Sequence, residues 1–492
     1  MSLVCGLDVG TSGVKAVLID ERGLVKASAS APLELSTPKP GWAEQDPDAW
    51  WLAAQKALKQ AVGPRLGKQV LALGLSGQMH SSVFLDRSSR VIRPALLWCD
   101  GRTSQECAEL TAHVGESKLR RWVANAAFEG FTLPKILWLR RHEPGAFRKL
   151  AKVLLPKDYV RFCMTGVLAT EPSDASATLL YDTARQKWSD AMLRATELPP
   201  ALLPDVVPSA AVAGRLTREA ARLTGLMEGT PIVAGGADNA CGAIGVGAVR
   251  AGDVVVSWGT SGTVLAPLAA PTVDRRMRAH TFCHAVPDTW YAMGVMLTAG
   301  GAFDWYGREL ARELTTDVAS QLAAEAEAAP AGSEGVLFLP YLQGERTPHR
   351  NAAARAAFVG MSLAHQRAHL SRAVLEGICF GLRDSLEILA EMGVAPRSVL
   401  VTGGGAGSAF VRQLQADVFG KKLEHVRAQG PAFGAALLAS VGAGWFRDVR
   451  GACRAVAVSG STTAPDRRQK RLYDEVYQRY RALYPALYGK GR

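Results

Sequence analysis

The tetrad Gly-Thr-Ser-Gly occurs twice in this chain, at residues 10–13 and 259–262, each time between two runs of strand-forming residues. The first copy lies within "SLVCGLDVGTSGVKAVLID" and the second within "DVVVSWGTSGTVLAPL". Two apolar runs joined by a short glycine-containing turn predict a β-hairpin. The repetition therefore predicts two halves that share a plan, each opening with a strand, a turn and a second strand.

Helical segments follow each hairpin. "DPDAWWLAAQKALKQAV" (46–62) has Asp46 or Asp48 as a helix start signal, and "TPIVAGGADNACGAIGVGAV" (230–249) indicates a buried strand, a glycine turn and a helix of small residues. The second half contains "SVLVTGGGAGSAFVRQLQADVF" (398–419), a strand, a glycine-rich turn and a helix. Strands alternating with helices predict an α/β fold class, with an N-terminal domain at 1–247, a C-terminal domain at 248–492 and a ligand cleft between them.

The composition fits a globular protein of more than one core. The chain has 492 residues, too many for one ordinary core, and it is 48% hydrophobic and 21% charged. The net charge of +12 suits an anionic ligand, but the basic residues form no long run, so we expect no nucleic-acid partner.

The cysteines and the chain start bear on localisation. Eight cysteines without a Cys-x-x-Cys pair predict reduced thiols. No secretory signal and no uncharged apolar run of about 18 residues is evident, so we expect a cytoplasmic protein without a membrane partner. A C-terminal segment, "RLYDEVYQRYRALY", is interpreted as a helix that packs through one stripe of side chains: Tyr473, Tyr477, Tyr480 and Tyr484.

The two tetrads could hold phosphate. Glycines allow tight turns and close approach of a ligand, and exposed backbone N–H groups with hydroxyls suit phosphate oxygens. A single such turn is more simply an ordinary hairpin turn, but two at matching places favour a polyphosphate held from both sides. The chain has neither the Gly-x-x-x-x-Gly-Lys-Ser/Thr motif nor a dinucleotide fingerprint after the first strand, which disfavours P-loop and Rossmann proteins.

Two carboxylates stand beside these turns. Asp8 ends the first strand, and a carboxylate next to phosphates needs a cation such as Mg²⁺ between them; the alternative is an Asp that hydrogen-bonds its own turn. Asp238 joins a strand to a helix, where it is either an N-cap or a base that deprotonates a nucleophilic hydroxyl. The helix N-terminus would keep Asp238 ionised rather than raise its pKa, which phosphoryl transfer tolerates.

Longer segments resemble the FGGY family of carbohydrate kinases. The resemblance runs from residue 6 to about 445 and is carried by "GWAEQDPDAWW", "GLSGQMH", "RPALLWCDGR", "GFTLPKILWLRRH" (130–142), "LLPKDYVRF" and "AAFVGMSLAHQRAHLSRAVLE" (356–376). It implies two duplicated RNase H-like domains, as in the actin, hexokinase and Hsp70-type ATPases. It also implies ATP-dependent phosphorylation of a sugar, D-xylulose at its 5-hydroxyl, with Mg²⁺ as cofactor and a homodimer as the expected assembly.

The resemblance also implies roles for individual residues. Asp238 matches the proton acceptor, and Asp8 matches an essential acid near the metal and the phosphates. Sugar contacts fall to Met79, His80 and Asn239, although His80 by itself would more often be an ordinary loop histidine. The residues that match nucleotide-binding elements are Thr11, Thr260, Ser261, Gly301, Gly404, Gly405 and Ala406.

The sequence departs from the family pattern at two positions, and three alternative functions stay open. Gln429 stands where the family often has Glu, and Gly407 where a larger polar residue is common. The substrate could be another ketopentose or a polyol. The chain could instead be an ATP-gated chaperone or an actin-like assembly protein, but only about 45 residues follow the second half, too few for a peptide-binding domain. A sugar sensor without activity is disfavoured by the presence of both Asp8 and Asp238.

Overall fold

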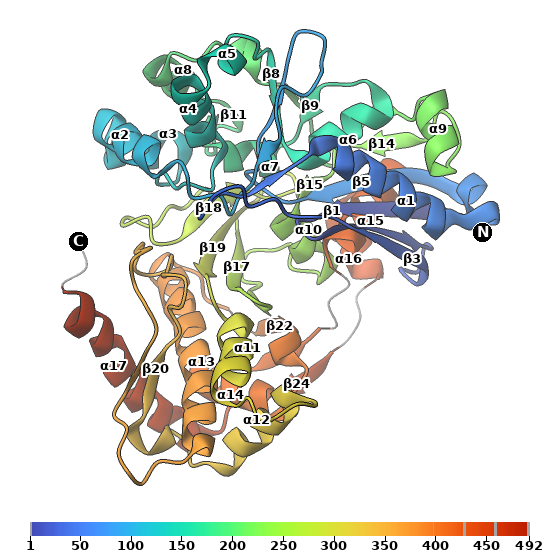
Figure 1. The fold of residues 1–492 in the computed structure, drawn as a ribbon. Helices are drawn as coiled ribbons and strands as arrows, with labels where there is room; N and C mark the ends of the chain where they lie inside the picture. The colour runs from blue at the N-terminus through green and yellow to red at the C-terminus, as the bar shows by residue number, and fades with distance from the viewer. Residues whose placement is uncertain (1, 397, 427–429, 457–459, 490–492) are drawn as a thin grey trace.

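Two lobes are built around two mixed β-sheets in the computed structural model, which describes residues 2–396, 398–426, 430–456 and 460–489 (Figure 1). In both sheets an antiparallel hairpin lies beside a parallel strand, β1–β2 with β5 in the first and β16–β17 with β22 in the second. This confirms the predicted α/β class and the shared plan of the two halves. The first sheet has the order β13 (Val212–Arg215), β14 (Pro231–Val233), β5 (Val70–Gly77), β1 (Leu3–Val9), β2 (Gly13–Ile19) and β3 (Val25–Pro32), with β15 (Gly236–Ala237) also paired to β5. The second has the order β18 (His280–Cys283), β19 (Trp290–Met296), β17 (Gly262–Leu268), β16 (Val255–Trp258), β22 (Val399–Gly403), β23 (Leu423–His425) and β24 (Ser461–Thr463).

Helices and short strand pairs surround the sheets. The first half adds α1 (Pro47–Leu66), α2 (Ser104–Val114), α3 (Glu116–Val123), α4 (Thr132–His142), α5 (Pro144–Phe147), α6 (Pro156–Thr165), α7 (Pro172–Ala175), α8 (Asp190–Thr196), α9 (Arg218–Thr224) and α10 (Asp238–Gly245). The second half adds α11 (Gly300–Leu310), α12 (Val318–Ala328), α13 (Arg367–Glu391), α14 (Ala409–Phe419), α15 (Pro431–Gly442), α16 (Val449–Ala455) and α17 (Arg467–Tyr488). The short strand pairs are β4 (Glu44–Gln45) with β7 (Ala95–Leu96), β6 (Val83–Leu85) with β8 (Lys152–Leu154), β9 (Ala169–Thr170) with β12 (Asp205–Val206), β10 (Tyr181–Asp182) with β11 (Lys187–Trp188), and β20 (Leu337–Leu339) with β21 (Ala357–Val359).

Helix α1 begins where the sequence predicts. The Asp46 side chain accepts a hydrogen bond from the Asp48 backbone N–H at 3.0 Å, and Pro47 occupies the first helical position. The buried face of α1 includes Trp50 and several alanines, and it packs on β1, β2 and β3. The small alanine side chains let the helix approach the sheet closely.

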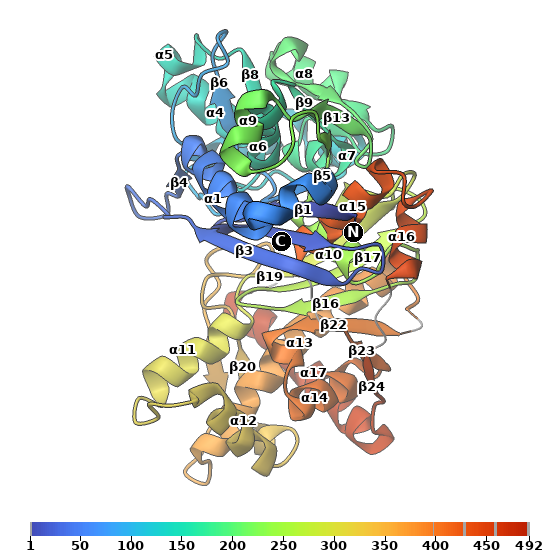
Figure 2. The same cartoon turned by 90° about the vertical axis from the view of Figure 1, so that its right-hand side faces the viewer.

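Helix α15 covers the opposite face of the same sheet, although in the chain it follows β23 of the second sheet. Side chains of β1 alternate between the faces, so Leu3 and Leu7 pack with the α1 side while Val4 packs with the α15 side. Figures 1 and 2 show α15 and α16, at the red end of the scale, beside the blue strands of the first half. A Cβ on Gly6 would lie 1.8 Å from the Ala432 carbonyl oxygen, so glycine is required for this contact. The first half is therefore completed by a helix from the end of the chain.

Helix α17 packs through its tyrosine stripe, as predicted. The Tyr473 hydroxyl donates to Glu376 at 2.8 Å, and the Tyr477 hydroxyl donates to Asp384 at 2.6 Å. Both acceptors lie on α13. The stripe is thus a packing surface with satisfied hydroxyls.

The cysteines are unpaired, as expected for reduced thiols. All eight are free, and six of them are buried. Burial raises the pKa of Cys5 to about 12, so its thiol stays protonated and unreactive. Among the helices of the described residues, none combines the length and the apolar character that crossing a membrane requires.

Candidate active site

Asp8 lies near the end of β1, between Lys15 of β2 and Ser76 of β5 in the sheet register. Burial raises the pKa of its carboxyl to about 6, and the neighbouring Ser76 and Lys15 oppose the shift. Its Oδ1 atom is buried and makes no hydrogen bond with any residue that the structure describes. Buried polar atoms normally have a partner, so this oxygen is a candidate contact for a ligand.

Asp238 is placed by strand pairing. Residues 236 and 237 pair with Ser76 and Gly77 of β5, so α10 starts at the end of the same sheet as Asp8. Asp238 is the first residue of the helix rather than its N-cap, and its Oδ1 accepts hydrogen bonds from the backbone N–H (2.7 Å) and the side-chain Nδ2 (3.0 Å) of Asn239. These bonds fix the carboxylate in one orientation.

The protonation state of Asp238 differs from the sequence-based expectation. Burial raises its pKa to about 7, the negative charge of Asp8 adds to the shift, and the two hydrogen bonds from Asn239 oppose it. The expectation that the helix N-terminus would keep this pKa low is wrong, because burial and a second carboxylate outweigh the helix dipole. A carboxylate with a pKa near neutrality can accept a proton in catalysis.

Met79 and His80 follow β5, and Met79 contacts Asn239, the residue after Asp238. The Met79 sulfur accepts hydrogen bonds from Asn239 Nδ2 at 3.4 Å and from the Tyr291 hydroxyl at 3.6 Å. His80 Nδ1 lies 2.7 Å from the Ala177 carbonyl oxygen, so Nδ1 carries the proton. Burial lowers the pKa of His80 to about 3, so the ring is neutral and Nε2 is left as an acceptor. The structure thus brings together the four residues that the sequence assigns to the sugar end of the site.

Lys135 and Thr132 hold the backbone of His80, and the sequence analysis assigned neither of them. His80 has φ +68°, a left-handed conformation that costs energy for a residue other than glycine. Its carbonyl oxygen accepts hydrogen bonds from Lys135 Nζ and Thr132 Oγ1, both at 3.0 Å. Lys135 is fully buried, and none of the described carboxylates lies within ion-pair distance of it. Both donors belong to "GFTLPKILWLRRH", so the segment could have directed attention to them.

We expect Lys135→Met to weaken sugar binding and leave ATP binding unchanged. The change removes the ammonium from the His80 carbonyl and frees the strained backbone, so the KM for the sugar should rise about 10-fold. Lys152→Met is the matched control, because Lys152 Nζ also donates to a backbone carbonyl, that of Leu203 at 3.0 Å, away from this site. Steady-state kinetics with each substrate varied would test this, and an equal rise in both KM values would contradict it.

Side chains of the second half also pack against this end of the site. His280 and Phe282 of β18 pack against Phe131. Tyr291 of β19 packs against Phe282. The His80 ring centroid is 4.4 Å from that of Phe131 and 5.8 Å from that of Phe282. No motif marks these residues in the sequence, because strands far apart in the chain bring them here.

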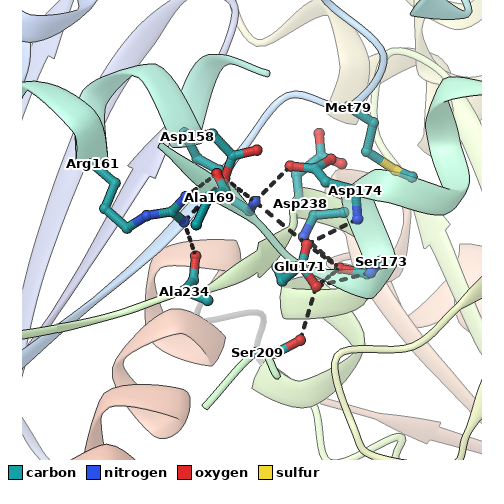
Figure 3. A network of polar contacts seen from close by, with 12 residues as sticks. Met79, Asp158, Arg161, Ala169, Glu171, Ser173, Asp174, Ser209, Ala234 and Asp238 are labelled. Carbon is teal, nitrogen blue, oxygen red and sulfur yellow. Dashed lines mark hydrogen bonds and ion pairs between the residues drawn. The ribbon is translucent and has the colours of Figure 1, made fainter. Parts of the chain in front are cut away.

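A buried charge network lies behind Asp238 (Figure 3). Lys157 Nζ lies 2.8 Å from Asp158, 2.9 Å from Asp174 and 3.4 Å from Glu171, and all four side chains are fully buried. Glu171 accepts from the Ser173 hydroxyl, whose oxygen accepts from the Ala237 backbone N–H at 2.9 Å. The network therefore fixes the residue that precedes Asp238. Lys157 and Asp158 belong to "LLPKDYVRF", so this segment could have directed attention to the network.

The nucleotide candidates of the second half gather around Trp258. The Thr260 carbonyl accepts from the Gly301 N–H at 3.0 Å, and Thr260 and Ser261 are exposed. A Cβ on Gly405 would lie 2.3 Å from the Trp258 ring, whereas a Cβ on Gly404 would meet nothing within 4 Å. The strand β22 leads directly into Gly404, Gly405 and the buried Ala406.

The turn at residues 10–13 forms hydrogen bonds with other residues of the first half. The Thr11 hydroxyl accepts from Trp98 Nε1 at 2.9 Å, and its carbonyl accepts from Gln45 Nε2 at 2.7 Å. No hydrogen bond links this turn to the turn at 259–262 in the part of the chain that the structure describes. The binding roles of all seven nucleotide candidates stay predictions.

A cavity of about 210 Å³ joins the two halves at the start of α10. Its walls include Asp238 and Asn239 from the first half and Ser257, Thr263 and Thr402 from the second. The Thr402 hydroxyl is buried without a partner among the described residues. The candidate base thus faces polar groups of the second half across an open space.

Known proteins are similar to this chain in sequence and in fold. Residues 3–245 match the N-terminal domain of the FGGY family of carbohydrate kinases, and residues 254–443 match its C-terminal domain. The chain is 44% identical over 442 residues to the xylulose kinase of Escherichia coli, covering 89% of this chain and 90% of that protein. A solved xylulose kinase from Rhodospirillum rubrum is 32% identical with a TM-score of 0.92, covering 99% of both chains. A gluconate kinase from Lactobacillus acidophilus is 27% identical with a TM-score of 0.94, covering 100% of this chain and 99% of that one.

Proposed function

The chain belongs to the FGGY family of carbohydrate kinases, and from that premise we propose that it transfers the terminal phosphate of ATP to the 5-hydroxyl of D-xylulose. The observation that carries the proposal is Asp238, held by Asn239 beside Met79 and His80. The sugar is chosen from the 44% identity to a xylulose kinase over nearly the whole chain. The product is D-xylulose 5-phosphate.

Asp238 acts as the general base in this proposal. Its carboxylate accepts the proton of the sugar hydroxyl as the oxygen bonds to the phosphorus, and ADP leaves from the opposite side. His80 Nε2 and the Asn239 amide hold other hydroxyls of the sugar. Phosphoryl transfer depends mostly on positioning and electrostatics, and the Lys157 network supplies positioning by fixing Ala237.

The nucleotide would bind to the second half and the first turn. Thr260, Ser261 and Thr11 supply turn backbone and hydroxyls for phosphates, and Gly301 and Gly404–Ala406 allow the adenosine to approach. Asp8 fits Mg²⁺, because its buried Oδ1 has no partner within the described residues. The bound ion would neutralise phosphate charge. Within those residues no group of three or more His, Cys, Asp or Glu could hold a metal, so phosphate oxygens and water would complete its shell.

We further propose a cytoplasmic homodimer. Eight free cysteines, most of them buried, fit a reducing compartment. The dimer is carried over from the family resemblance, and light scattering on the purified protein would test it.

The proposed function predicts a clear substrate preference. An assay that couples ADP release to a colour change should give D-xylulose the highest kcat/KM in a panel of ketopentoses, aldopentoses, polyols and D-gluconate. Gluconate belongs in the panel because a gluconate kinase shares the fold closely. A preference for any other panel member by more than about 10-fold, roughly 1.4 kcal/mol, would replace D-xylulose as the substrate.

A further inference from the structure

The chemistry of the proposed reaction fixes the form of the sugar that the site must hold. A ketopentose closes into a furanose by joining its 5-hydroxyl to C2. If the 5-hydroxyl is the nucleophile, the bound sugar is therefore the open-chain form, with a free carbonyl at C2. A carbonyl oxygen only accepts hydrogen bonds, so the site needs a donor at that position. This inference rests on the proposed function.

The two histidines at this end of the site offer acceptors instead. His80 Nδ1 donates its proton to the Ala177 carbonyl in a hydrogen bond, and His280 Nδ1 lies 3.0 Å from Asn125 Oδ1. Asn125 Oδ1 also accepts from the Thr281 N–H, which identifies it as the oxygen. Burial lowers the pKa of both rings, so each presents an unprotonated Nε2. Neither neutral ring can donate to a carbonyl from its free nitrogen.

Arg346 carries N–H donors and lies beside the aromatic side chains at this end of the site. It lies on the loop after β20. The backbone N–H groups of Arg346 and Leu297 donate hydrogen bonds to Glu345 Oε1 at 2.8 and 3.2 Å and anchor this loop. The Arg346 Cζ atom lies 5.3 Å from the centre of the Phe128 ring. The Phe128 ring centre lies 5.3 Å from that of His280, so Arg346 and His280 contact the same aromatic ring. The charge of Arg346 also contributes to lowering the pKa of both His80 and His280.

The guanidinium of Arg346 has no polar partner among the residues that the structure describes. No described residue accepts a hydrogen bond from it or forms an ion pair with it. Burial lowers its pKa, with Glu129 and Glu345 opposing, so the surroundings do not fully compensate its charge. By contrast, Arg350 on the same loop lies 5.8 Å from the same Phe128 ring and is paired with Glu116 at 3.0 Å.

We propose that Arg346 is a specificity-determining residue that donates hydrogen bonds to the C2 carbonyl oxygen of the open-chain ketose. In this proposal the second half binds the carbonyl end of the sugar through Arg346, while Asp238 of the first half deprotonates the 5-hydroxyl at the other end. Without Arg346, the carbonyl oxygen would face the acceptor nitrogens of two histidines. A hydroxyl at the same carbon could still donate to one of them. Arg346 therefore favours a ketose over the corresponding polyol.

The test compares Arg346→Met with Arg350→Met. We expect Arg346→Met to lower kcat/KM for D-xylulose about 10- to 100-fold, the range for loss of a charge-assisted hydrogen bond, with the KM for ATP unchanged. Xylitol binding, measured as a substrate or as a competitive inhibitor, should weaken less than 5-fold, roughly 1 kcal/mol. Arg350→Met should keep wild-type preference, and Arg346→Lys should restore part of the loss.

The outcomes separate the two proposals. A wild-type protein that phosphorylates D-xylulose, with Arg346→Met unchanged or weakened equally toward D-xylulose and xylitol, overturns the role of Arg346 and leaves the function standing. A wild-type protein that does not phosphorylate D-xylulose overturns the function and this inference with it. If thermal melting shows that Arg346→Met does not fold, Arg346→Lys and Arg346→Gln carry the same comparison.

Discussion

Replacing Asp238 by Asn should lower turnover by about 10²–10⁴-fold, the range for loss of a general base. The amide keeps the shape of the side chain but cannot accept the proton of the sugar hydroxyl. Because the pKa of Asp238 is about 7, the kcat/KM of the wild-type protein should rise with pH through that value, and the residual activity of Asp238→Asn should lose this rise. A pH series of kcat/KM measures both effects.

The stability of the same variant has a predictable sign. Folding raises the pKa of Asp238 from 3.8 to about 7, so between these values the folded protein binds more protons than the unfolded chain. This carboxyl therefore lowers the free energy of unfolding as pH rises through that window. Asp238→Asn removes the penalty, and its melting temperature relative to wild type should increase from pH 4 to pH 7.

Asp384→Asn is the matched control. Burial also raises the pKa of Asp384 to about 7, but this residue lies on α13 and accepts from Tyr477, away from the cavity. Its replacement should leave the pH profile of kcat/KM unchanged. Turnover of Asp238→Asn within threefold of wild type would remove Asp238 from its role as base.

Asp8→Ala should abolish most activity, by about 10²-fold or more, because a preorganised group that stabilises the transferring phosphate is lost. The sugar contacts of the first half and the nucleotide candidates of the second half must meet for in-line transfer, which hinge closure achieves most simply. Asp8 would hold Mg²⁺ and the phosphates against the first half. With D-xylulose, a non-hydrolysable ATP analogue and Mg²⁺, the wild-type radius of gyration should fall, and Asp8→Ala should blunt the change.

The scattering experiment has its own control. Asp20→Ala removes a carboxylate at the far end of the same hairpin, paired with Lys26 at 2.8 Å, and should close like wild type. Wild-type scattering curves that superimpose with and without both ligands would contradict hinge closure. Full closure of Asp8→Ala would instead contradict only the role given to Asp8.

Local patterns predicted the frame of the fold and part of the site. The two hairpins, the start of α1 at Asp46 and the strand-to-helix junction at Asp238 were all visible, because each depends on neighbouring residues. Lys135 and Arg346 were not, since their importance depends on contacts with residues distant in the sequence. The pKa of Asp238 was predicted with the wrong direction, because burial and the approach of Asp8 cannot be seen in a linear sequence.

Two sequence-based statements are not tested by the structure. Gln429, where the sequence departs from the family pattern, lies outside the described residues. The boundary between residues 247 and 248 is likewise a prediction, and the packing of α15 on the first sheet shows that contacts cross it.

The placement of α15 has a consequence for how the protein is made. One face of the first sheet is covered by residues 431–442, so a ribosome that has released only the first half presents an uncovered apolar surface. Contacts between β1 and α15 span more than 400 residues of sequence, and such non-local contacts slow folding and expose chains to aggregation. The first half should therefore complete its fold only after synthesis is nearly finished. A gene truncated before residue 431 should yield an aggregating product rather than a sugar-binding fragment.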